Sequence, residues 1–359
     1  MDRKEEIAEL LAEYKRLGIA SQVDYEKFYL YSIITHSTAI EGSTVTEIEN
    51  QLLFDEGIAV RGRSMTEQLM NIDLKNAYES AFVMAKSHRD VTVGVLKSLS
   101  AMVLKNTGTV YNTLGGTFDS SRGDLRLVNV TAGAGGRSYM NYLKVPSRLH
   151  DFCKWLNEGR ERLLANPDVY ECYAFSFEAH LRLVTIHPWV DGNGRMSRLL
   201  MNMLQVEFGL IPTKVLSEEK AEYIQALVCA RDEELVEPFV RFMFDAFARC
   251  LSSEMELFKS NLNDEAAFDK NDGGQKTIDD GGQKTTNAVD RKQLTGGQKT
   301  RASIMDMMQA DSGISSTAIA RRLGINRSAV SKHIKILQDE GLVRRDGPAK
   351  GGKWIVLNR

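Results

Sequence analysis

The side chains best suited to chemistry are concentrated in residues 187–198, which read His-Pro-Trp-Val-Asp-Gly-Asn-Gly-Arg-Met-Ser-Arg. Within this stretch, His187 is the only side chain whose ordinary pKa lies near neutrality, which is the property expected of a general base. Asp191 offers a hard carboxylate oxygen of the kind that holds Mg²⁺ together with substrate phosphates. A base and a metal ligand this close in sequence point to phosphoryl or nucleotidyl transfer.

The second half of the same stretch is suited to binding phosphate. Gly192, Asn193 and Gly194 form a turn that leads into a helix, where unpaired backbone N–H groups lie at the positive end of the helix dipole. Such an end binds anions, and Arg195 and Arg198 add forked donors on the first turns. The glycines do not match the dinucleotide fingerprint, because Ser197 stands at its last position and no strand precedes it.

Two helices must position these residues. An apolar pattern over 171–186 runs into Pro188, which cannot continue a helix, so His187 is expected at a helix end. The following helix has one apolar face, and its arginines lie on another face. The expected active site is therefore a short loop between two buried helices.

The stretch resembles, position by position, the signature of the Fic (Fido) family, His-Pro-Phe-x-(Asp/Glu)-Gly-Asn-Gly-Arg-x-x-Arg, with Trp189 in place of Phe. The resemblance implies a helical protein that transfers AMP from ATP to a hydroxyl side chain of a target protein. His187 would then deprotonate that hydroxyl, and Asp191 would hold Mg²⁺. The remaining signature residues would bind the nucleotide: Gly192, Asn193 and Gly194 in the anion cradle, Arg195 and Arg198 on the β- and γ-phosphates.

Two further elements extend the resemblance. Ser37-Thr-Ala-Ile-Glu41-Gly42 is similar to the family's inhibitory pattern (Ser/Thr)-x-x-x-Glu-(Gly/Asn), so Glu41 would pair with Arg198 and silence the isolated protein. Gly42 can end the preceding helix, and Thr44 with Glu47 would then form a capping box for the next helix. Tyr223 corresponds to a tyrosine that contacts adenine in relatives, although an aromatic residue on an amphipathic helix is usually a core residue.

Apolar residues at three- and four-residue spacing predict a mainly α chain. Helices are expected at 3–17, 24–40, 66–87, 92–105, 147–164, 169–186, 194–208, 217–230 and 236–258. The region 125–142 departs from this period and predicts two short strands around a Gly-rich turn. This hairpin is either a surface decoration or the family's flap, whose edge would dock an unknown target protein in extended form.

The carboxyl-terminal part contains a linker and a second domain. Gly-Gly-Gln-Lys-Thr occurs three times between 261 and 300, where polar residues dominate; no apolar strand precedes any copy, so a flexible linker is favoured over a phosphate loop. Residues 301–359 resemble a winged helix-turn-helix of the bacterial regulator type. The predicted domains are an N-terminal helical region with the inhibitory helix (1–95), a Fic domain (96–258), the linker (259–300) and the winged helix (301–359).

The winged helix is a candidate DNA-binding domain. Residues 301–359 contain 11 Lys and Arg against 5 Asp and Glu, whereas the whole chain has a formal net charge of −2. Winged helices also serve as protein-docking modules, so the partner stays open. If the domain binds DNA, the residues facing it would be Arg327, Ser328, Ser331, Lys332 and Lys335.

Composition bounds the remaining choices. The hydrophobic fraction of 43% and the charged fraction of 26% are those of a globular protein, and no apolar run reaches the roughly 20 residues of a membrane span. The four cysteines form no C-x-x-C pair, and the amino terminus has no signal-peptide core. A cytoplasmic enzyme is expected, with its oligomeric state open. Two alternatives also stay open: Glu41 could orient water to remove AMP from a modified protein, or the chain could be a nucleotide-sensing DNA-binding regulator.

Overall fold

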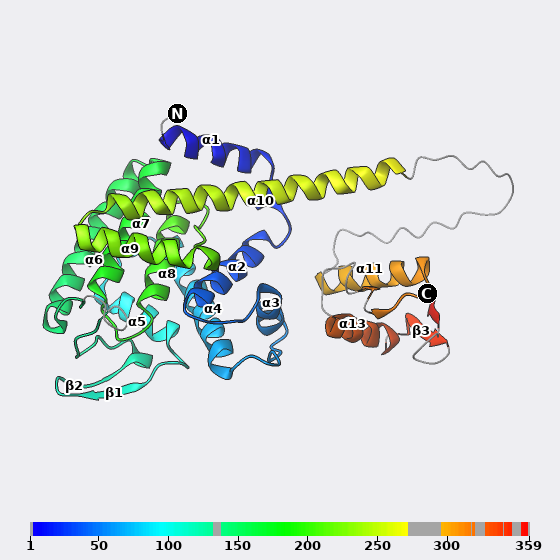
Figure 1. Ribbon diagram of the computed structural model, residues 1–359, viewed down its shortest axis with the longest axis horizontal. Coiled ribbons are helices and arrows are strands. Elements are labelled where there is room, and N and C mark those ends of the chain that lie inside the picture. The colour runs from blue at the N-terminus through cyan, green and yellow to red at the C-terminus, as the bar shows by residue number, and fades with distance from the viewer. Residues whose placement is uncertain are drawn as a thin grey trace. The chain divides into compact units, whose positions relative to one another are not determined.

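The computed structural model describes residues 3–131, 138–271, 296–316, 318–319, 327–339, 341–346 and 353–357. The chain divides into two compact units, Met1–Gly274 and Gln275–Arg359, which are described separately (Figure 1). None of the described helices is long and apolar enough to cross a membrane.

The larger unit is a helical domain, as expected. Each helix predicted from the apolar spacing is present, with ends within a few residues except in α10, which continues past the predicted end at 258 to Asn271. The spacing did not predict α3, although a helix start was expected near Thr44. The helices are α1 (Arg3–Arg16), α2 (Tyr25–Ile40), α3 (Glu47–Asp55), α4 (Met65–Lys86), α5 (Val93–Val103), α6 (Val145–Ala165), α7 (Val169–Ile186), α8 (Asn193–Glu207), α9 (Lys220–Glu233) and α10 (Glu237–Asn271).

Helix α8 lies at the centre of this unit and packs against α7 on one side and α4 on another. Nearly all of its residues are buried, so its polar side chains must find partners inside the protein. One apolar cluster joins α8 to α2, α4, α5, α6 and α7, and a second joins α7 to α1, α9 and α10. The motif at the start of α8 is therefore held on a rigid support.

The strands are not where the sequence predicted them. The antiparallel pair is β1 (Val110–Thr113) with β2 (Gly116–Asp119), before the predicted region. Within 125–142, the described residues form only one isolated bridge, between Thr131 and Ser138, and residues 132–137 lie outside the described part. The prediction of two strands at 125–130 and 137–142 was wrong, because side-chain contacts rather than a ladder hold this segment, as shown below.

Two smaller expectations also need correction. The capping box before α3 is formed by Thr46 and Glu49, not by Thr44 and Glu47, because Thr44 donates both its N–H and its hydroxyl to Glu67 at 2.7 Å. The predicted linker 259–300 overlaps helix at both ends, since α10 runs to Asn271 and α11 begins at Gly296. Residues 272–295, with the first two Gly-Gly-Gln-Lys-Thr copies, lie outside the described part.

The smaller unit contains α11 (Gly296–Ala310), α13 (Arg327–Asp339) and the antiparallel pair β3 (Val343–Asp346) and β4 (Lys353–Val356). Its core includes Ile304, Ile334 and Trp354, whose indole N–H donates to the carbonyl of Ile314. The sequence resemblance predicts a two-stranded wing at 343–345 and 353–357, and the two strands lie there. Much of the predicted first helix of the motif, residues 317 and 320–326, lies outside the described residues.

Candidate active site

His187 stands where helix α7 stops. It has left-handed backbone angles (φ 52°, ψ 61°), as Pro188 prevents the helix from continuing. Its Nδ1 lies 3.2 Å from the carbonyl of Val184, to which a neutral imidazole would donate its proton. That tautomer leaves Nε2 as the free acceptor, which is the state required of a base.

The imidazole is also covered. The ring of Tyr139 stacks on it with 3.7 Å between ring centroids, and the guanidinium of Arg231 lies 5.1 Å from the centre of the Tyr139 ring. Burial lowers the pKa of His187 to about 4, with Arg126 and Arg231 adding to the effect. His187 is therefore neutral at physiological pH. The sequence did not single out Tyr139.

The loop between the two helices is fastened by Asn193. Its side-chain oxygen accepts the N–H of Trp189 at 3.1 Å, and its amide donates to the Trp189 carbonyl at 2.9 Å. Trp189 itself is fully buried and donates its indole N–H to the carbonyl of Gly123. The sequence placed Asn193 in an anion cradle, but in the structure its side chain holds the shape of the loop.

Gly192 and Gly194 are required at the start of α8 for different reasons. Gly192 has φ 77°, a conformation that side chains other than glycine rarely adopt. At Gly194, a Cβ atom would lie 2.6 Å from the Glu41 carboxylate and 3.1 Å from Arg198. The second glycine thus lets a carboxylate from another helix reach the amino end of α8.

Arg195 is a buried cation with unused donors. Its side chain is 3% exposed, and its only described polar contact is with Asp191 at 3.4 Å. Both Nε and Nη1 are buried without a hydrogen-bond partner in the described part of the chain. Because unmade hydrogen bonds of a buried charged group are costly, this guanidinium is poised to receive an anion.

Arg198, three residues further on, has its donors engaged. Nη2 donates to Glu41 at 2.6 Å and to the Ser37 carbonyl at 2.9 Å, and Nε donates to the Ser37 hydroxyl at 2.8 Å. Nη1 lies 3.3 Å from the hydroxyl of Tyr223. Helix α2, which carries Ser37 and ends at Glu41, therefore closes around this guanidinium.

The electrostatics keep this pair charged. Burial acts to raise the pKa of Glu41, but the charge and hydrogen bond of Arg198 outweigh it, so the pKa is lowered. The pKa of Arg198 is raised by Tyr223 and Glu41 despite its burial. Tyr223 is also buried, and its hydroxyl lies 2.9 Å from Nε2 of the buried His180. Tyr223 thus contacts Arg198 at Nη1, whereas α2 binds Nε and Nη2.

Arg126 is a functional residue that the sequence reasoning missed. Its guanidinium donates to the carbonyls of His187 at 2.7 Å, Val128 at 2.8 Å and Met140 at 2.7 Å, and its own N–H donates to the Pro188 carbonyl. It is 1% exposed. A charged residue within the apolar run Leu-Arg-Leu-Val was the signal that could have found it. Arg126 fastens the segment 125–142 to the loop of the base.

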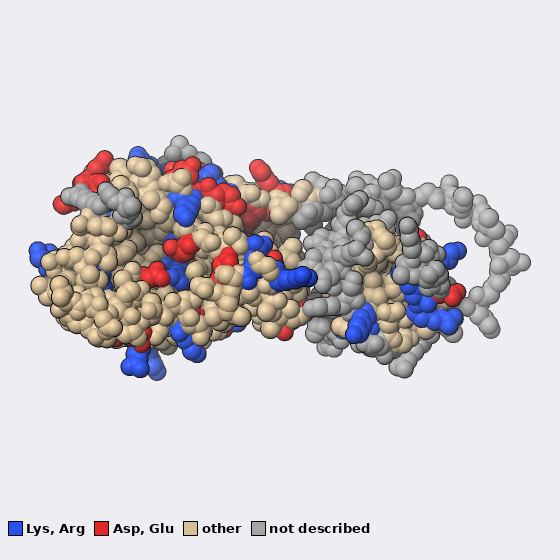
Figure 2. Space-filling view, turned by 60° about the horizontal axis from the view of Figure 1, so that its bottom comes forward, with Lys and Arg blue, Asp and Glu red and all other residues tan. Residues whose placement is uncertain are grey.

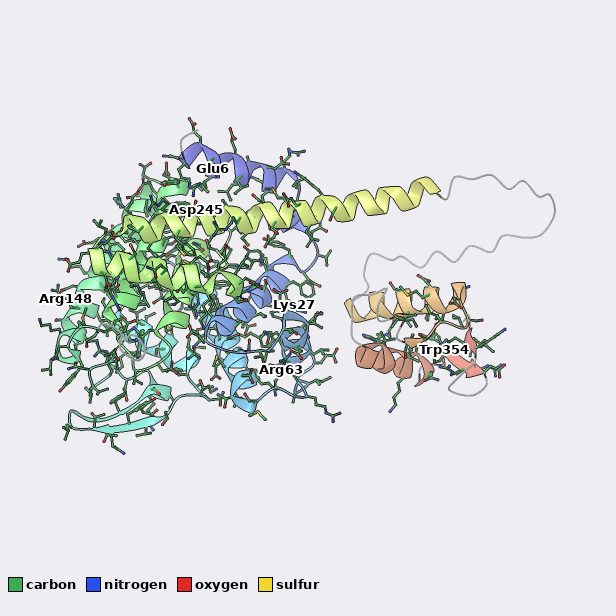
Figure 3. All side chains as sticks on the ribbon, viewed as in Figure 1. Glu6, Lys27, Arg63, Arg148, Asp245 and Trp354 are labelled. Atoms are coloured by element: carbon green, nitrogen blue, oxygen red, sulfur yellow. The ribbon has the colours of Figure 1, made fainter. Side chains whose placement is uncertain are left out.

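A pocket of about 870 Å³ is lined by Tyr139, the residue whose ring covers His187. Three residues near the base also line this pocket: Tyr139, Ile186 and Arg231. Its apolar surface includes Phe152 and Trp155. Its size is that of pockets that hold a nucleoside or several side chains of a partner protein. Figure 3 labels Arg148, another of its lining residues, on α6.

Asp191 is the one motif carboxylate available for a metal ion. Its side chain is 59% exposed, and its Oδ1 accepts the N–H of Gly192 at 2.6 Å. The described residues include no cluster of three metal-ligating side chains. A single exposed carboxylate fits Mg²⁺, which is usually held by one or two carboxylates plus substrate phosphates and water.

In the smaller unit, the candidate DNA-binding residues share helix α13, which begins at Arg327. Lys335 is exposed on this helix. The side chains of Arg327, Ser328, Ser331 and Lys332 lie outside the described residues. In the larger unit, Figure 2 shows basic and acidic side chains interspersed over the visible face rather than gathered into one basic surface.

Comparisons with known proteins agree with this geometry. Residues 90–205 match the Fic/DOC family and residues 297–346 match a helix-turn-helix domain. The chain is 29% identical over 259 residues to the protein adenylyltransferase Fic of Drosophila melanogaster, covering 69% of this chain and 46% of that protein. It is 28% identical over 220 residues to protein adenylyltransferase fic-1 of Caenorhabditis elegans, covering 61% and 39%. The chain thus spans less than half the length of these curated relatives.

Solved structures show the same fold. A Fic-domain-containing signalling protein from Bacteroides thetaiotaomicron aligns with a TM-score of 0.58 at 20% identity, over 71% of this chain and 97% of that one. A Fic family protein from Desulfovibrio desulfuricans aligns with a TM-score of 0.56 at 18% identity, over 100% and 97%. This chain therefore carries a domain of the Fic/DOC family, followed by a helix-turn-helix domain.

Proposed function

We propose that the protein is an adenylyltransferase that moves AMP from ATP to a hydroxyl side chain of a target protein. The observation that carries this proposal is the buried Arg195 near the amino end of α8, whose Nε and Nη1 have no hydrogen-bond partner among the described residues. A polyphosphate would satisfy those donors and the helix dipole together. Relatives named protein adenylyltransferase support the same reaction.

The reaction follows from the position of the base. Nε2 of His187 accepts the proton of the target hydroxyl, and the oxygen attacks the α-phosphorus of ATP. A phosphorus–oxygen bond forms to the target while the bond to the departing pyrophosphate breaks. The low pKa of His187 keeps Nε2 unprotonated beforehand. Arg195 and the α8 backbone N–H groups hold the phosphates in place, which is the main protein contribution to such transfers.

Mg²⁺ would be held by Asp191 together with the ATP phosphates, and it would supply charge neutralisation when bound. Asp191 meets that role because it is exposed and its Oδ1 is oriented by the Gly192 N–H. The contact between Asp191 and Arg195 at 3.4 Å also keeps the carboxylate beside the phosphate-binding guanidinium.

We propose that α2 inhibits this reaction. Arg198 would grip the terminal phosphates, but Ser37 and Glu41 occupy its donors. ATP could still reach Arg195 while Arg198 remains engaged, so the nucleotide would bind without the alignment that transfer requires. Tyr223 lies against the same guanidinium, and its burial assigns it to this support rather than to an open contact with adenine.

The experiment uses ATP labelled at the α-phosphate, Mg²⁺ and a cell lysate as the source of targets. Wild type is compared with Glu41→Gly and with Glu41→Gly/His187→Ala. Breaking a buried ion pair of this kind should raise label transfer by about 10- to 1,000-fold in the single variant. The double variant should lose it. Label that persists without His187 would contradict the assignment of the base, and the absence of label in every variant would contradict the proposed activity.

The helix-turn-helix domain is a second candidate for function. We propose that it binds DNA through α13, where Lys335 is exposed. Two observations favour this proposal: residues 297–346 match a helix-turn-helix domain, and residues 301–359 are basic. A mobility-shift assay at several salt concentrations tests this. Binding that weakens steeply with salt is the expected result, and no affinity at low salt would refute it.

A further inference from the structure

A second cavity, of about 540 Å³, lies between helix α2 and the helices that support the active site. From α2 it is lined by Tyr29, Leu30 and Ile33. The opposite wall is formed by Phe82 of α4, by Val206 of α8 and by the turn 209–212. None of these residues belongs to the site described above, yet α2 is the helix that carries Glu41.

The cavity and the inhibitory contact lie on one face of α2. Its lining residues at 26, 29, 30 and 33 are spaced as one helical stripe. The same stripe continues to Ser37 and Glu41, which bind Arg198. At 1.5 Å per residue, Leu30 and Glu41 are about 16 Å apart along the helix axis.

Helix α8, like α2, contributes both to the cavity and to the inhibitory contact. Val206 near its carboxyl end lines the cavity, and Arg198 near its amino end is held by α2. The two helices therefore meet twice, once around the cavity and once around the guanidinium. Since its walls come from α2 as well as from α4 and α8, the cavity exists in this form only while α2 is docked.

The lining indicates which molecule would fit. It is mostly apolar, and the tyrosine hydroxyls are already used: Tyr25 bonds to Tyr14 at 2.8 Å, and Tyr29 donates to the Pro212 carbonyl at 2.9 Å. The charged lining residues are Glu26, Lys27 and Lys86, and the exposure of Glu26 and Lys86 places them at the rim. Lys27, labelled in Figure 3, pairs with Asp55 at 2.7 Å.

Two rim charges remain for a ligand. Glu26 on α2 and Lys86 on α4 line the cavity, and within the described residues neither has an ion-pair or hydrogen-bond partner. They have opposite signs and stand on opposite walls. A molecule with an apolar body and both an ammonium and a carboxylate group would satisfy both.

We propose that this cavity binds an apolar zwitterion, of the class of apolar amino acids and short peptides, and that its occupancy strengthens the contact of Glu41 with Arg198. The regulatory half of this proposal rests on the proposed adenylyltransferase function, whereas the binding half does not. A ligand that contacts both walls binds the docked form of α2 better than the released form, so it shifts the population toward the inhibited enzyme. The ligand would be a co-inhibitor.

Binding is tested first, by calorimetry on the full chain with the dipeptide leucylphenylalanine. Its N-acetyl and C-amide forms, each lacking one charge, should bind roughly 2- to 5-fold more weakly, as expected for partly exposed ion pairs. Leu30→Trp should fill the cavity and abolish binding, while Val83→Trp, at an exposed position of α4 outside the cavity, should not. Lys86→Gln should weaken dipeptide binding as much as the C-amide does, because both changes remove the pair between Lys86 and the carboxylate. The control Lys154→Gln, on α6 outside the cavity, should leave the affinity unchanged.

Coupling is tested by reciprocity. Glu41→Gly loosens α2, so it should weaken dipeptide binding by about 5-fold or more, and the dipeptide should slow amide hydrogen exchange in residues 34–41 of the wild type. In the labelling assay, the dipeptide should lower label transfer by the wild type. The size of this decrease should follow the ratio of its affinities for the docked and the released form of α2.

The outcomes separate the two proposals. Equal dipeptide binding by wild type and Leu30→Trp, or no binding at all, would overturn the cavity site. Equal affinity in Glu41→Gly with unchanged exchange in 34–41 would overturn the coupling. If Glu41→Gly shows no label transfer, the proposed activity fails, but calorimetry and exchange still decide whether the cavity binds the dipeptide and holds α2.

Discussion

The surroundings of the two arginines on the first turns of α8 differ sharply, although both side chains are 3% exposed. Within the part of the chain that the structure describes, Arg195 has buried donors without partners, whereas Arg198 makes contacts with Ser37, Glu41 and Tyr223. Helix α2 therefore closes one half of the anion site and leaves the other half ready. Under the proposed function, this difference predicts that ATP binding and ATP alignment are separate events, governed by different arginines.

Replacing Arg195, the arginine with unused donors, should have the largest effect on label transfer. In the Glu41→Gly background, Arg195→Ala should lower label transfer by about 100- to 1,000-fold, since it removes preorganised donors to phosphate. Arg195→Lys keeps the charge but not the fork, and it should restore only part of the activity. Calorimetry should show the same order in the affinity for ATP, with the parent tightest, Arg195→Lys intermediate and Arg195→Ala weakest. If the alanine variant binds ATP as tightly as its parent, Arg195 is not the phosphate receptor.

Ser37→Ala should release Arg198 in part. The change removes the acceptor of Nε but leaves the Ser37 carbonyl and Glu41 in place. An unsatisfied buried donor costs about 1–3 kcal/mol, so label transfer should rise roughly 5- to 150-fold, and by less than in Glu41→Gly. The measurement is initial rate at saturating ATP. A rise equal to that of Glu41→Gly would mean that Ser37, and not the carboxylate, is the main inhibitory contact.

Tyr223→Phe should have a smaller effect on the same guanidinium. It removes the hydroxyl that lies 3.3 Å from Arg198 and 2.9 Å from His180. The protein should lose about 1 kcal/mol of unfolding free energy, measured by urea denaturation, and activity should change only a few-fold. A large rise in the KM for ATP, with stability unchanged, would instead favour a direct contact with adenine.

The pH dependence should show the smallest change. His187 acts as a base only when neutral, and its pKa is lowered from the usual 6.5 to about 4. For Glu41→Gly, kcat/KM should therefore fall by less than twofold between pH 7.0 and 5.5, where an ordinary histidine would lose about tenfold. A fall centred near pH 6.5 would show that the imidazole is exposed in the working enzyme.

The sequence predicted the parts of the molecule that are local. Residues 187–198 are contiguous, so their types and spacing predicted the helix–loop–helix that the structure shows. Segment 125–142 was misjudged because its conformation depends on Arg126 reaching carbonyls up to 61 positions away in sequence. The strands at 110–119 were missed since their alternation is short, although Gly115 and Gly116 marked the turn.

The contacts across α2 could be predicted only through resemblance. The pattern from Ser37 to Glu41 suggested a partner in Arg198, and the structure joins them across 157 positions. The cavity beside Leu30 had no such signal, because its walls come from three separate helices and a turn. Cavities of this kind depend on how helices pack, and periodicity describes only each helix by itself.

The three carbonyls bound by Arg126 have a practical consequence for changing the target of the enzyme. One guanidinium ties both ends of the segment, at Val128 and Met140, to the loop of His187. Between those two anchors, Tyr139 stacks on the His187 ring, so the geometry of the base depends on both Arg126 and Tyr139. Under the proposed function, libraries that vary 129–138 while retaining Arg126 and Tyr139 should yield folded proteins with new target preferences, whereas libraries that vary Arg126 should yield proteins that no longer hold the base in place.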